Sequence, residues 1–172
     1  MTGTLRTERL TLRRPAARDW PAWRAFFESE RSRAHGGPRE LGQSWRRFAG
    51  TLGHWEFHGF GLWAVTLTGD DTALGLIGGF YPADWPEKEI GWMILSADAE
   101  GKGIAHEAAT AAIDHAYTVW NWPTAVSYIS HDNTRSIALA ERLGARLDAD
   151  APNPRPDSPC LVYRHPNPEP KP

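Results

Sequence analysis

The sequence predicts one α+β domain, a mixed and mainly antiparallel sheet with helices on both faces. Length is the first support, because 172 residues suit a single domain that buries its own core. Composition is the second, since 41% hydrophobic and 23% charged residues are ordinary for a globular protein. The third is the order of apolar patterns, which reads strand, helix, helix, three strands, helix, strand, helix, strand. We expect the domain to span residues 1–165.

The spacing of apolar residues predicts the first strand and the first two helices. Residues 9–14 alternate apolar with polar or basic side chains, as a half-buried strand does, and Pro15 ends the run. Asp19 is placed to cap a helix that has Pro21 in its first turn. Two helical stripes follow: Trp20, Trp23, Phe26 and Phe27, up to Gly36, and then Leu41, Trp45, Phe48, Leu52 and Trp55. We expect the tryptophans of both stripes to lie in the core.

The middle of the chain has the alternation of β-structure. Residues 61–81 predict a hairpin with its turn at residues 69–71, and residues 87–95 predict a third strand. On this third strand Glu89 shares one face with Gly91, Met93 and Leu95, so a single carboxylate lies on an otherwise apolar face. A glycine-rich turn then leads into a helix that begins near Ile104 and stops before Pro123.

The last elements are shorter. Residues 124–131 predict a strand, residues 136–143 a short helix that Gly144 ends, and residues 160–164 a closing strand. Eight of the 14 prolines fall in the last 21 residues, which limits regular structure there. We expect residues 166–172 to form a disordered, proline-rich tail.

Charge and composition exclude several partners. A formal net charge of -2 provides no broad basic face for a phosphate backbone, so nucleic acid is not an expected partner. No apolar run approaches the roughly 18 residues of a membrane span, and Cys160 is the only cysteine, so no intrachain disulfide forms. We expect a cytoplasmic protein with no membrane partner.

The segment from Glu100 to Ala105 predicts a phosphate-binding loop. Gly101 and Gly103 let the backbone approach a ligand, and the following helix start offers unpaired N–H donors at the positive end of its dipole. Lys102 adds a point charge. The alternative is a plain strand-to-helix turn, because glycine spacing alone is a weak signal.

At this loop the sequence resembles the GCN5-related N-acetyltransferase (GNAT) family, whose acetyl-CoA loop follows the pattern Gln/Arg-x-x-Gly-x-Gly/Ala. Gly103 and Ala105 match this pattern, whereas Glu100 places an acid at the Gln/Arg position. Glu89 stands 11 residues before Glu100, where the family often carries a catalytic Glu. The run from Asn133 to Ser136 resembles the family's later Asn-x-x-Ser helix.

Two further stretches, residues 7–13 and 59–65, resemble the subgroup that acetylates the N-termini of ribosomal proteins. The resemblance covers about residues 5–165. It implies the GNAT fold and transfer of an acetyl group from acetyl-CoA to a primary amine, by direct attack in a ternary complex. We expect no metal cofactor, and a monomer and a homodimer both remain open.

The resemblance also assigns cofactor-binding residues. The strand backbone before the loop is expected to pair with the pantetheine amides, the loop and helix start with the phosphates, and Asn133 with the pantetheine or an ordered water. The residues are Met93, Ile94 and Leu95 on the strand, and Gly101, Lys102, Gly103, Ile104, Ala105 and His106 at the loop.

Glu89 is the expected catalytic base. An amine must lose its proton before it attacks, and a carboxylate on an apolar face has its pKa raised toward the working range. The alternative is a surface Glu beside Lys88 at a sheet edge. In many family members a Tyr serves as the acid that assists thiolate departure, but Ala140 stands at that position.

Ser136 is therefore the expected acid, as the resembling subgroup suggests. The alternative is that Ser136 and Asn133 make only local bonds at a helix start. Tyr128 and Tyr163 are further candidates for the acid.

Trp85 and Trp92 are the expected walls of an acceptor pocket, with Trp55 or Trp63 as additional candidates. A protein N-terminus, a polyamine, an amino acid and an antibiotic amine all remain open as acceptors. Glu100 and Ala140 motivate the alternative of a non-catalytic acyl-CoA-binding module. A metal site at His54 and His58 is set aside, because no third ligand lies near them in the sequence.

Overall fold

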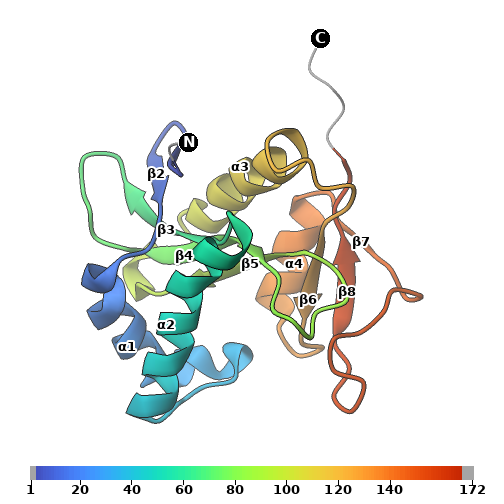
Figure 1. The fold of residues 1–172 in the computed structure, drawn as a ribbon, viewed down its shortest axis with the longest axis horizontal. Coiled ribbons are helices and arrows are strands. Elements are labelled where there is room, and N and C mark those ends of the chain that lie inside the picture. Colours follow the sequence, from blue (N-terminus) through green and yellow to red (C-terminus); the bar gives the residue numbers. More distant parts are fainter. Residues whose placement is uncertain (1–2, 168–172) are drawn as a thin grey trace.

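A computed structural model describes residues 3–167 and shows a mixed, mainly antiparallel sheet with helices on both faces, as the sequence predicts (Figure 1). The strand order is β1-β2-β3-β4-β5-β6-β8-β7, and every neighbouring pair is antiparallel except β5 and β6. The strands are β1 (Leu5–Arg6), β2 (Leu10–Arg13), β3 (Leu62–Leu67), β4 (Gly75–Phe80), β5 (Glu89–Ile94), β6 (Val126–Ile129), β7 (Arg146–Leu147) and β8 (Leu161–Arg164).

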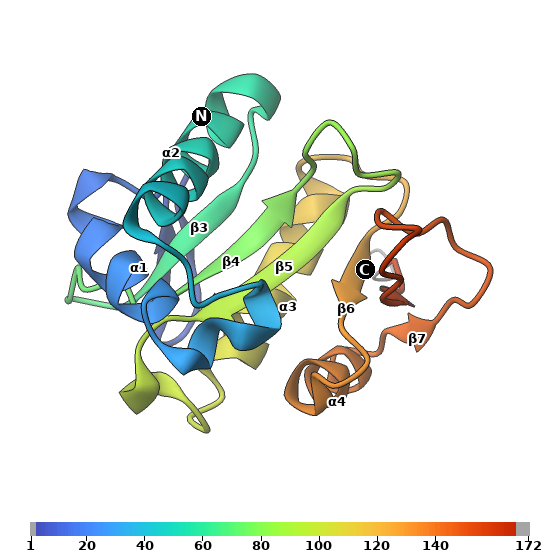
Figure 2. The same ribbon diagram turned by 90° about the horizontal axis from the view of Figure 1, so that it is seen from below.

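The helices lie on the two faces of this sheet (Figures 1 and 2). They are α1 (Trp20–Phe27), α2 (Leu41–His58), α3 (Ile104–Thr118) and α4 (Thr134–Arg142), with short 3₁₀ helices η1 (Ala17–Asp19), η2 (Glu30–His35) and η3 (Ala97–Ala99). Alternation along the strands supplies both faces: Leu76 and Met93 pack with the α1 and α2 side, whereas Ile77 packs with α3. Glu89 and Met93 therefore share the α1 and α2 face.

The prediction that the helical tryptophans are core residues is correct for only part of the stripes. Trp23 and Trp55 are buried, but Trp45 is 59% exposed and Leu41 is 51% exposed. Both exposed residues belong to the first turns of α2, which extend beyond the strands in Figure 1. The apolar spacing identified the helix, but it did not show which of its turns pack against the rest of the domain.

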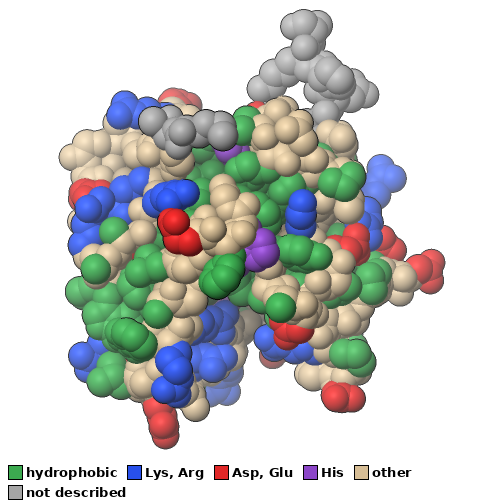
Figure 3. All heavy atoms as spheres, viewed as in Figure 1, with side chains coloured by type: hydrophobic (Ala, Val, Ile, Leu, Met, Phe, Trp, Pro, Cys, Tyr) green, Lys and Arg blue, Asp and Glu red, His purple; other side chains and the backbone are tan. Residues whose placement is uncertain are grey.

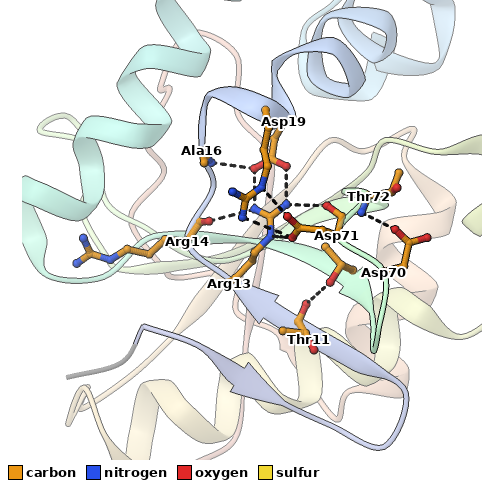
Figure 4. Close-up of polar contacts among 10 residues, drawn as sticks. Thr11, Arg13, Arg14, Ala16, Asp19, Asp70, Asp71 and Thr72 are labelled. Atoms are coloured by element: carbon orange, nitrogen blue, oxygen red, sulfur yellow. Dashed lines mark hydrogen bonds and ion pairs between the residues drawn. The ribbon is translucent and has the colours of Figure 1, made fainter.

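Asp19 precedes α1 as expected, yet its carboxylate does not cap the helix. It is buried, accepts from the backbone N–H of Ala16 at 2.8 Å, and holds Arg13 through contacts of 2.8 and 2.9 Å (Figure 4). Arg13 also pairs with Asp71 of the β3–β4 turn. The charge of Arg13 draws the carboxylate away from the helix end, and the network ties the start of α1 to the first hairpin.

Other element boundaries differ locally from the prediction. The first helix ends at Phe27 instead of continuing toward Gly36, and η2 fills the interval. The two-residue strands β1 and β7 were not predicted, because patterns this short carry no periodicity. The expected disordered tail falls mostly on residues 168–172, which lie outside the described residues. Among the described residues, no helix is both long and apolar enough to cross a membrane.

Candidate active site

The site begins where two parallel strands part. β5 and β6 share one register pair, Glu89 with Val126. Ser127 then fills the next position by donating from Oγ to the carbonyl of Ile90 at 2.6 Å, while its oxygen lies 2.8 Å from Nε2 of the buried His165. Beyond this point the two strands diverge (Figure 2). The edge of β5 is thereby open toward a gap in the middle of the sheet.

The backbone of β5 offers hydrogen-bonding groups to this gap. Leu95 donates its N–H to the carbonyl of Leu74 at 2.9 Å, so it faces β4. Since peptide groups alternate along a strand, Trp92 and Ile94 direct theirs toward the gap. Of the three expected strand residues, only Ile94 lines the cavity that occupies the gap, whereas the side chains of Met93 and Leu95 are buried on the α1 and α2 face.

That cavity has a volume of about 1920 Å³ and brings most of the predicted cofactor residues together. They come from β5, the glycine loop, the first turn of α3 and the start of α4. The lining includes Trp92, Ile94, Gly101, Gly103, Ile104, Ala105, His106, Asn133 and Ser136. Lys102 does not line it, although its carbonyl accepts from Nη1 of Arg9, a lining residue, at 3.1 Å.

The glycine loop has the conformation that the sequence indicated. Gly101 and Gly103 adopt φ angles of 71° and 75°, in the left-handed region that a side chain disfavours. Gly103 immediately precedes α3, a helix of 15 residues. The first-turn N–H groups of α3 have no acceptor within the helix, so they and the dipole form an anion site at the cavity wall.

Glu100 forms ion pairs with two arginines, which compensate its negative charge at the cavity. It accepts from Arg31 Nη2 at 2.6 Å and from Arg135 Nη1 at 2.8 Å, and Arg31 chiefly holds the pKa of Glu100 below its usual range. Arg31 also donates to the carbonyls of Ile94 at 3.0 Å and Leu95 at 2.6 Å. A chain of contacts thus joins η2, β5, the loop and α4 around the cavity.

Ser136 and Asn133 lie at the start of α4. The side-chain oxygen of Asn133 accepts the N–H of Ser136 at 3.2 Å, which is the helix-capping role that the sequence left open for it. Ser136 Oγ accepts from Trp92 Nε1 at 3.0 Å. Because that bond uses an oxygen lone pair, the hydroxyl proton of Ser136 remains available for donation into the cavity.

Glu89 lies at the parting of β5 and β6, on the sheet face opposite Ser136. Burial raises its pKa to about 7, although a hydrogen bond from Trp85, the backbone of Tyr128 and the charges of Arg47 and Arg155 act in the opposite direction. Trp85 Nε1 donates to its Oε2 at 2.7 Å. The carboxylate is therefore oriented and poised to exchange a proton near neutral pH.

Comparison with known proteins identifies the family. A model described as "Acetyltransferase (GNAT) domain" matches residues 9–146. The chain belongs to the GNAT acetyltransferase family. The structure is similar to an acetyltransferase from Agrobacterium tumefaciens str. C58, with 46% sequence identity over 94% of this chain and 93% of that one and a TM-score of 0.88.

More distant structures share the fold. A GNAT-family acetyltransferase from Bacillus anthracis is 20% identical over 94% of this chain and 95% of its own, with a TM-score of 0.73. The ribosomal-protein-S5-alanine acetyltransferase from Vibrio fischeri is 17% identical over 98% of this chain and 99% of its own, with a TM-score of 0.68. At these identities the likeness bears on the fold alone.

The residues of this acetyltransferase fit acetyl-CoA, which its family uses. A pyrophosphate matches the donor-rich loop and helix start, and an extended pantetheine matches the open edge of β5. Four arginines that the sequence did not assign to the site also line the cavity: Arg9, Arg31, Arg135 and Arg142. Arg31 and its partner Glu100 are 69 positions apart, so local patterns contain no signal for the contact.

The expected acceptor-side tryptophans separate in the acetyltransferase structure. Trp85 lies beside Glu89, but Trp92 lies on the opposite face of the sheet and lines the cofactor cavity. Trp55 and Trp63 are buried, and Trp55 Nε1 donates to the carbonyl of Leu62 at 2.9 Å. Only Trp85 of the four is placed to meet an acceptor near Glu89.

His54, considered as a metal ligand, and Tyr163, considered as the acid, both make contacts within the protein core. His54 Nε2 accepts the N–H of Tyr81 at 2.8 Å and its Nδ1 lies 2.9 Å from the carbonyl of Phe60, so both ring nitrogens are engaged. Over residues 3–167 the acetyltransferase has no cluster of three or more His, Cys, Asp or Glu side chains arranged to hold a metal. Tyr163 is buried among Ile129, Ala140 and Ala145.

Proposed function

We propose that this acetyltransferase transfers the acetyl group of acetyl-CoA to a primary amine by direct attack in a ternary complex, with Glu89 as the base. The observation that carries the proposal is a carboxylate with a pKa of about 7 at the point where β5 and β6 part, on the strand whose Trp92 and Ile94 line the cavity. The acceptor then approaches from the α1 and α2 face and meets the cofactor through the gap in the sheet.

The chemistry assigned to each residue follows from its contacts. Acetyl-CoA, when bound, supplies a thioester carbonyl carbon that an amine can attack. Glu89 removes the proton that the amine must lose, and its pKa of about 7 is close to the roughly 8 of an α-ammonium group. Trp85 holds the carboxylate in place through its 2.7 Å hydrogen bond.

Ser136 is the group we assign to thiolate departure. The N–H of Trp92 fixes the Ser136 oxygen, which leaves the hydroxyl proton for donation to the leaving sulfur. The β5 edge and the α3 start position the cofactor. Orientation of this kind accounts for about 7–11 kcal/mol of a barrier in well-placed reacting pairs.

The proposal is tested by following free thiol release from acetyl-CoA with a panel of primary amines. We expect kcat/KM to rise as pH increases through about 7, because Glu89 acts in its ionised form. Glu89→Gln should lower kcat by about 10²–10⁴-fold and remove this pH dependence. Glu56→Gln, at an exposed carboxylate far along α2, is the matched control.

Absence of thiol release with every amine would contradict the proposal and favour the non-catalytic module. That alternative rested on Glu100 and Ala140. Glu100 is accounted for by Arg31 and Arg135, and Ala140 is fully buried in the small core of α4 and β8, where a larger side chain has no room.

A further inference from the structure

Three arginines lie on the acceptor side of Glu89 and take no part in the cofactor cavity just described: Arg39, Arg47 and Arg155. Arg47, on α2, stacks its guanidinium 5.1 Å from the ring centre of Phe27 and donates to the carbonyl of His35 at 2.9 Å. Arg155 places its guanidinium 5.5 Å from the ring centre of Trp85, the residue that holds Glu89.

Arg39 and Arg47 are half-buried and Arg155 is exposed, and none of the three has the anionic partner that other half-buried arginines have. Arg13, Arg31 and Arg164 each hold a carboxylate within 2.6–2.8 Å. Among residues 3–167, by contrast, no carboxylate oxygen lies within 4.0 Å of a nitrogen of Arg39, Arg47 or Arg155. Nε of Arg39 is also buried without a hydrogen-bond partner.

The absence of an internal anion is unfavourable for Arg47 in particular. Burial, together with the charges of Arg39 and Arg155, lowers the pKa of Arg47 to about 10, while the charge of Glu89 acts in the opposite direction. Arg39, Arg155 and Glu89 are thus each within electrostatic reach of Arg47. A buried guanidinium with one neutral acceptor is stabilised when a carboxylate offers it two parallel hydrogen bonds.

The segments that hold these arginines surround the acceptor side. Arg39 precedes α2, Arg47 lies within it, and Arg155 belongs to the loop before β8. Asn153 fixes that loop by donating to the carbonyl of Cys160 at 2.7 Å and accepting the N–H of Arg155 at 3.2 Å. The face in Figure 3 is hollowed between the α2 side and the α4 side, and Lys and Arg side chains border this hollow.

We propose that Arg47, assisted by Arg39 and Arg155, binds a carboxylate of the acceptor, so that the acceptor is an amine that carries its own acid group. This inference rests on the proposed function and names its substrate class. The amine meets Glu89 and the acid meets Arg47, which gives each charge of the acceptor an opposite charge on the protein. A polyamine would instead place additional cations against three arginines.

The test offers each amine in two forms, with a free carboxylate and as the primary amide, and measures thiol release. One pair is L-alanine and L-alaninamide, and a peptide pair is Ala-Asp-Ala and Ala-Asn-Ala, both amidated at the C-terminus. The two pairs distinguish a free amino acid from an acidic peptide N-terminus. We expect kcat/KM for the acid to exceed that for the amide by tenfold or more in at least one pair, since a hydrogen bond to a charged group is worth about this factor.

Arg47→Gln should bring the acid-to-amide ratio close to one, and Arg47→Lys should leave an intermediate ratio. Arg46→Gln is the matched control, because Arg46 is an exposed neighbour on the same helix, and it should preserve the ratio. Binding gives a second readout. In the wild type, the N-acetylated acid should raise the Tm more than the N-acetylated amide does. In Arg47→Gln, the two compounds should raise the Tm equally.

The outcomes separate the two proposals. Thiol release from acids and amides at equal rates, or faster from the amides, overturns the carboxylate site and leaves acetyl transfer intact. A preference for acids that survives in Arg47→Gln also overturns it. Lack of thiol release with every amine in either form overturns the proposed function itself.

Discussion

Glu89 has a position that suits the base we propose but weakens the fold. Its folded-state pKa of about 7 lies above the value of 4.5 for a free Glu side chain. At low pH Glu89 is protonated in both the folded and the unfolded chain, so it does not reduce the free energy of unfolding. As pH rises from about 4.5 to 7, the unfolded chain ionises first, so the free energy of unfolding falls, and above 7 the loss stays constant.

We therefore expect Glu89→Gln to be more stable than the wild type at pH 8 by at most about 3 kcal/mol, with little difference at pH 4.5. Gln keeps an acceptor oxygen for Trp85 and removes the charge that burial disfavours. Urea unfolding at several pH values measures the effect. Glu56→Gln, at a surface carboxylate, should give no such pH-dependent gain, and an unchanged stability of Glu89→Gln at pH 8 would contradict the burial of charge at this position.

Some properties of Glu89 could be predicted from the sequence and others could not. Alternation along residues 87–95 was enough to place Glu89 on an apolar face and to predict a raised pKa. The hydrogen bond from Trp85 and the charge of Arg47 were not predictable, because they depend on where a loop and a helix return to the strand. A strand pattern specifies the face of a side chain, but not its neighbours from other elements.

Among the elements, the short helix η2 contributes to the site through Arg31. Arg31 of this short helix binds Glu100 and two carbonyls at the end of β5, while Arg135 of α4 binds the other oxygen of Glu100. The Glu100 carboxylate neutralises two arginines beside the loop to which we assign the phosphates. It also adds a negative charge near the anionic groups of acetyl-CoA.

Glu100→Gln should therefore tighten binding of CoA by about three- to tenfold, because it removes one repulsive charge and frees Arg31 and Arg135 for the phosphates. Isothermal titration at 50 mM and 300 mM salt measures the change, which should shrink at the higher salt. Glu8→Gln, at an exposed acid that also lines the cavity, controls for general charge. Weaker binding in Glu100→Gln would instead show that the contacts of Glu100 matter more than its charge.

Elements with their own sequence signals were predicted well. The loop and α3 agreed closely with their glycine and alanine spacing, because a left-handed turn and an apolar stripe are local properties. The 3₁₀ helix η2 was predicted as a continuation of α1, since its six residues, five of them polar, have no periodicity that would mark a boundary. Its role in the site depends on contacts 63 to 69 positions away.

On the scale of the whole molecule, the sheet is two parts joined at a narrow point. β1 to β5 form one part and β6 to β8 the other, with the Glu89 and Val126 pair, the Ser127 bond and the Arg164–Glu87 ion pair at 2.8 Å between them. The cavity takes its walls from both parts. A ligand that fills it adds contacts across the joint that the protein alone does not make.

The fold class could be predicted as a whole because its parts have clear periodicities, and the structure confirms it. The opening between β5 and β6 could not be derived from periodicity. It arises where two strands begin in register and then separate, and both strands retain ordinary strand patterns through the separation. The family resemblance supplied that feature, since the expected pantetheine pairing needs an unpaired β5 edge.

We expect CoA at 100 times its Kd to stabilise the folded protein by about 2.7 kcal/mol, which corresponds to a Tm increase of about 5–10 °C for a domain of this size. Gly103→Ala should lose most of this increase, because a Cβ disfavours the left-handed turn that aims the first amides of α3. Gly69→Ala is the matched control: its φ of 89° imposes a similar strain in the β3–β4 turn, away from the cavity. Both variants should lower the Tm of the free protein, but only Gly103→Ala should lower the increase caused by CoA. Equal increases in the two variants would contradict the assignment of the loop as the phosphate site.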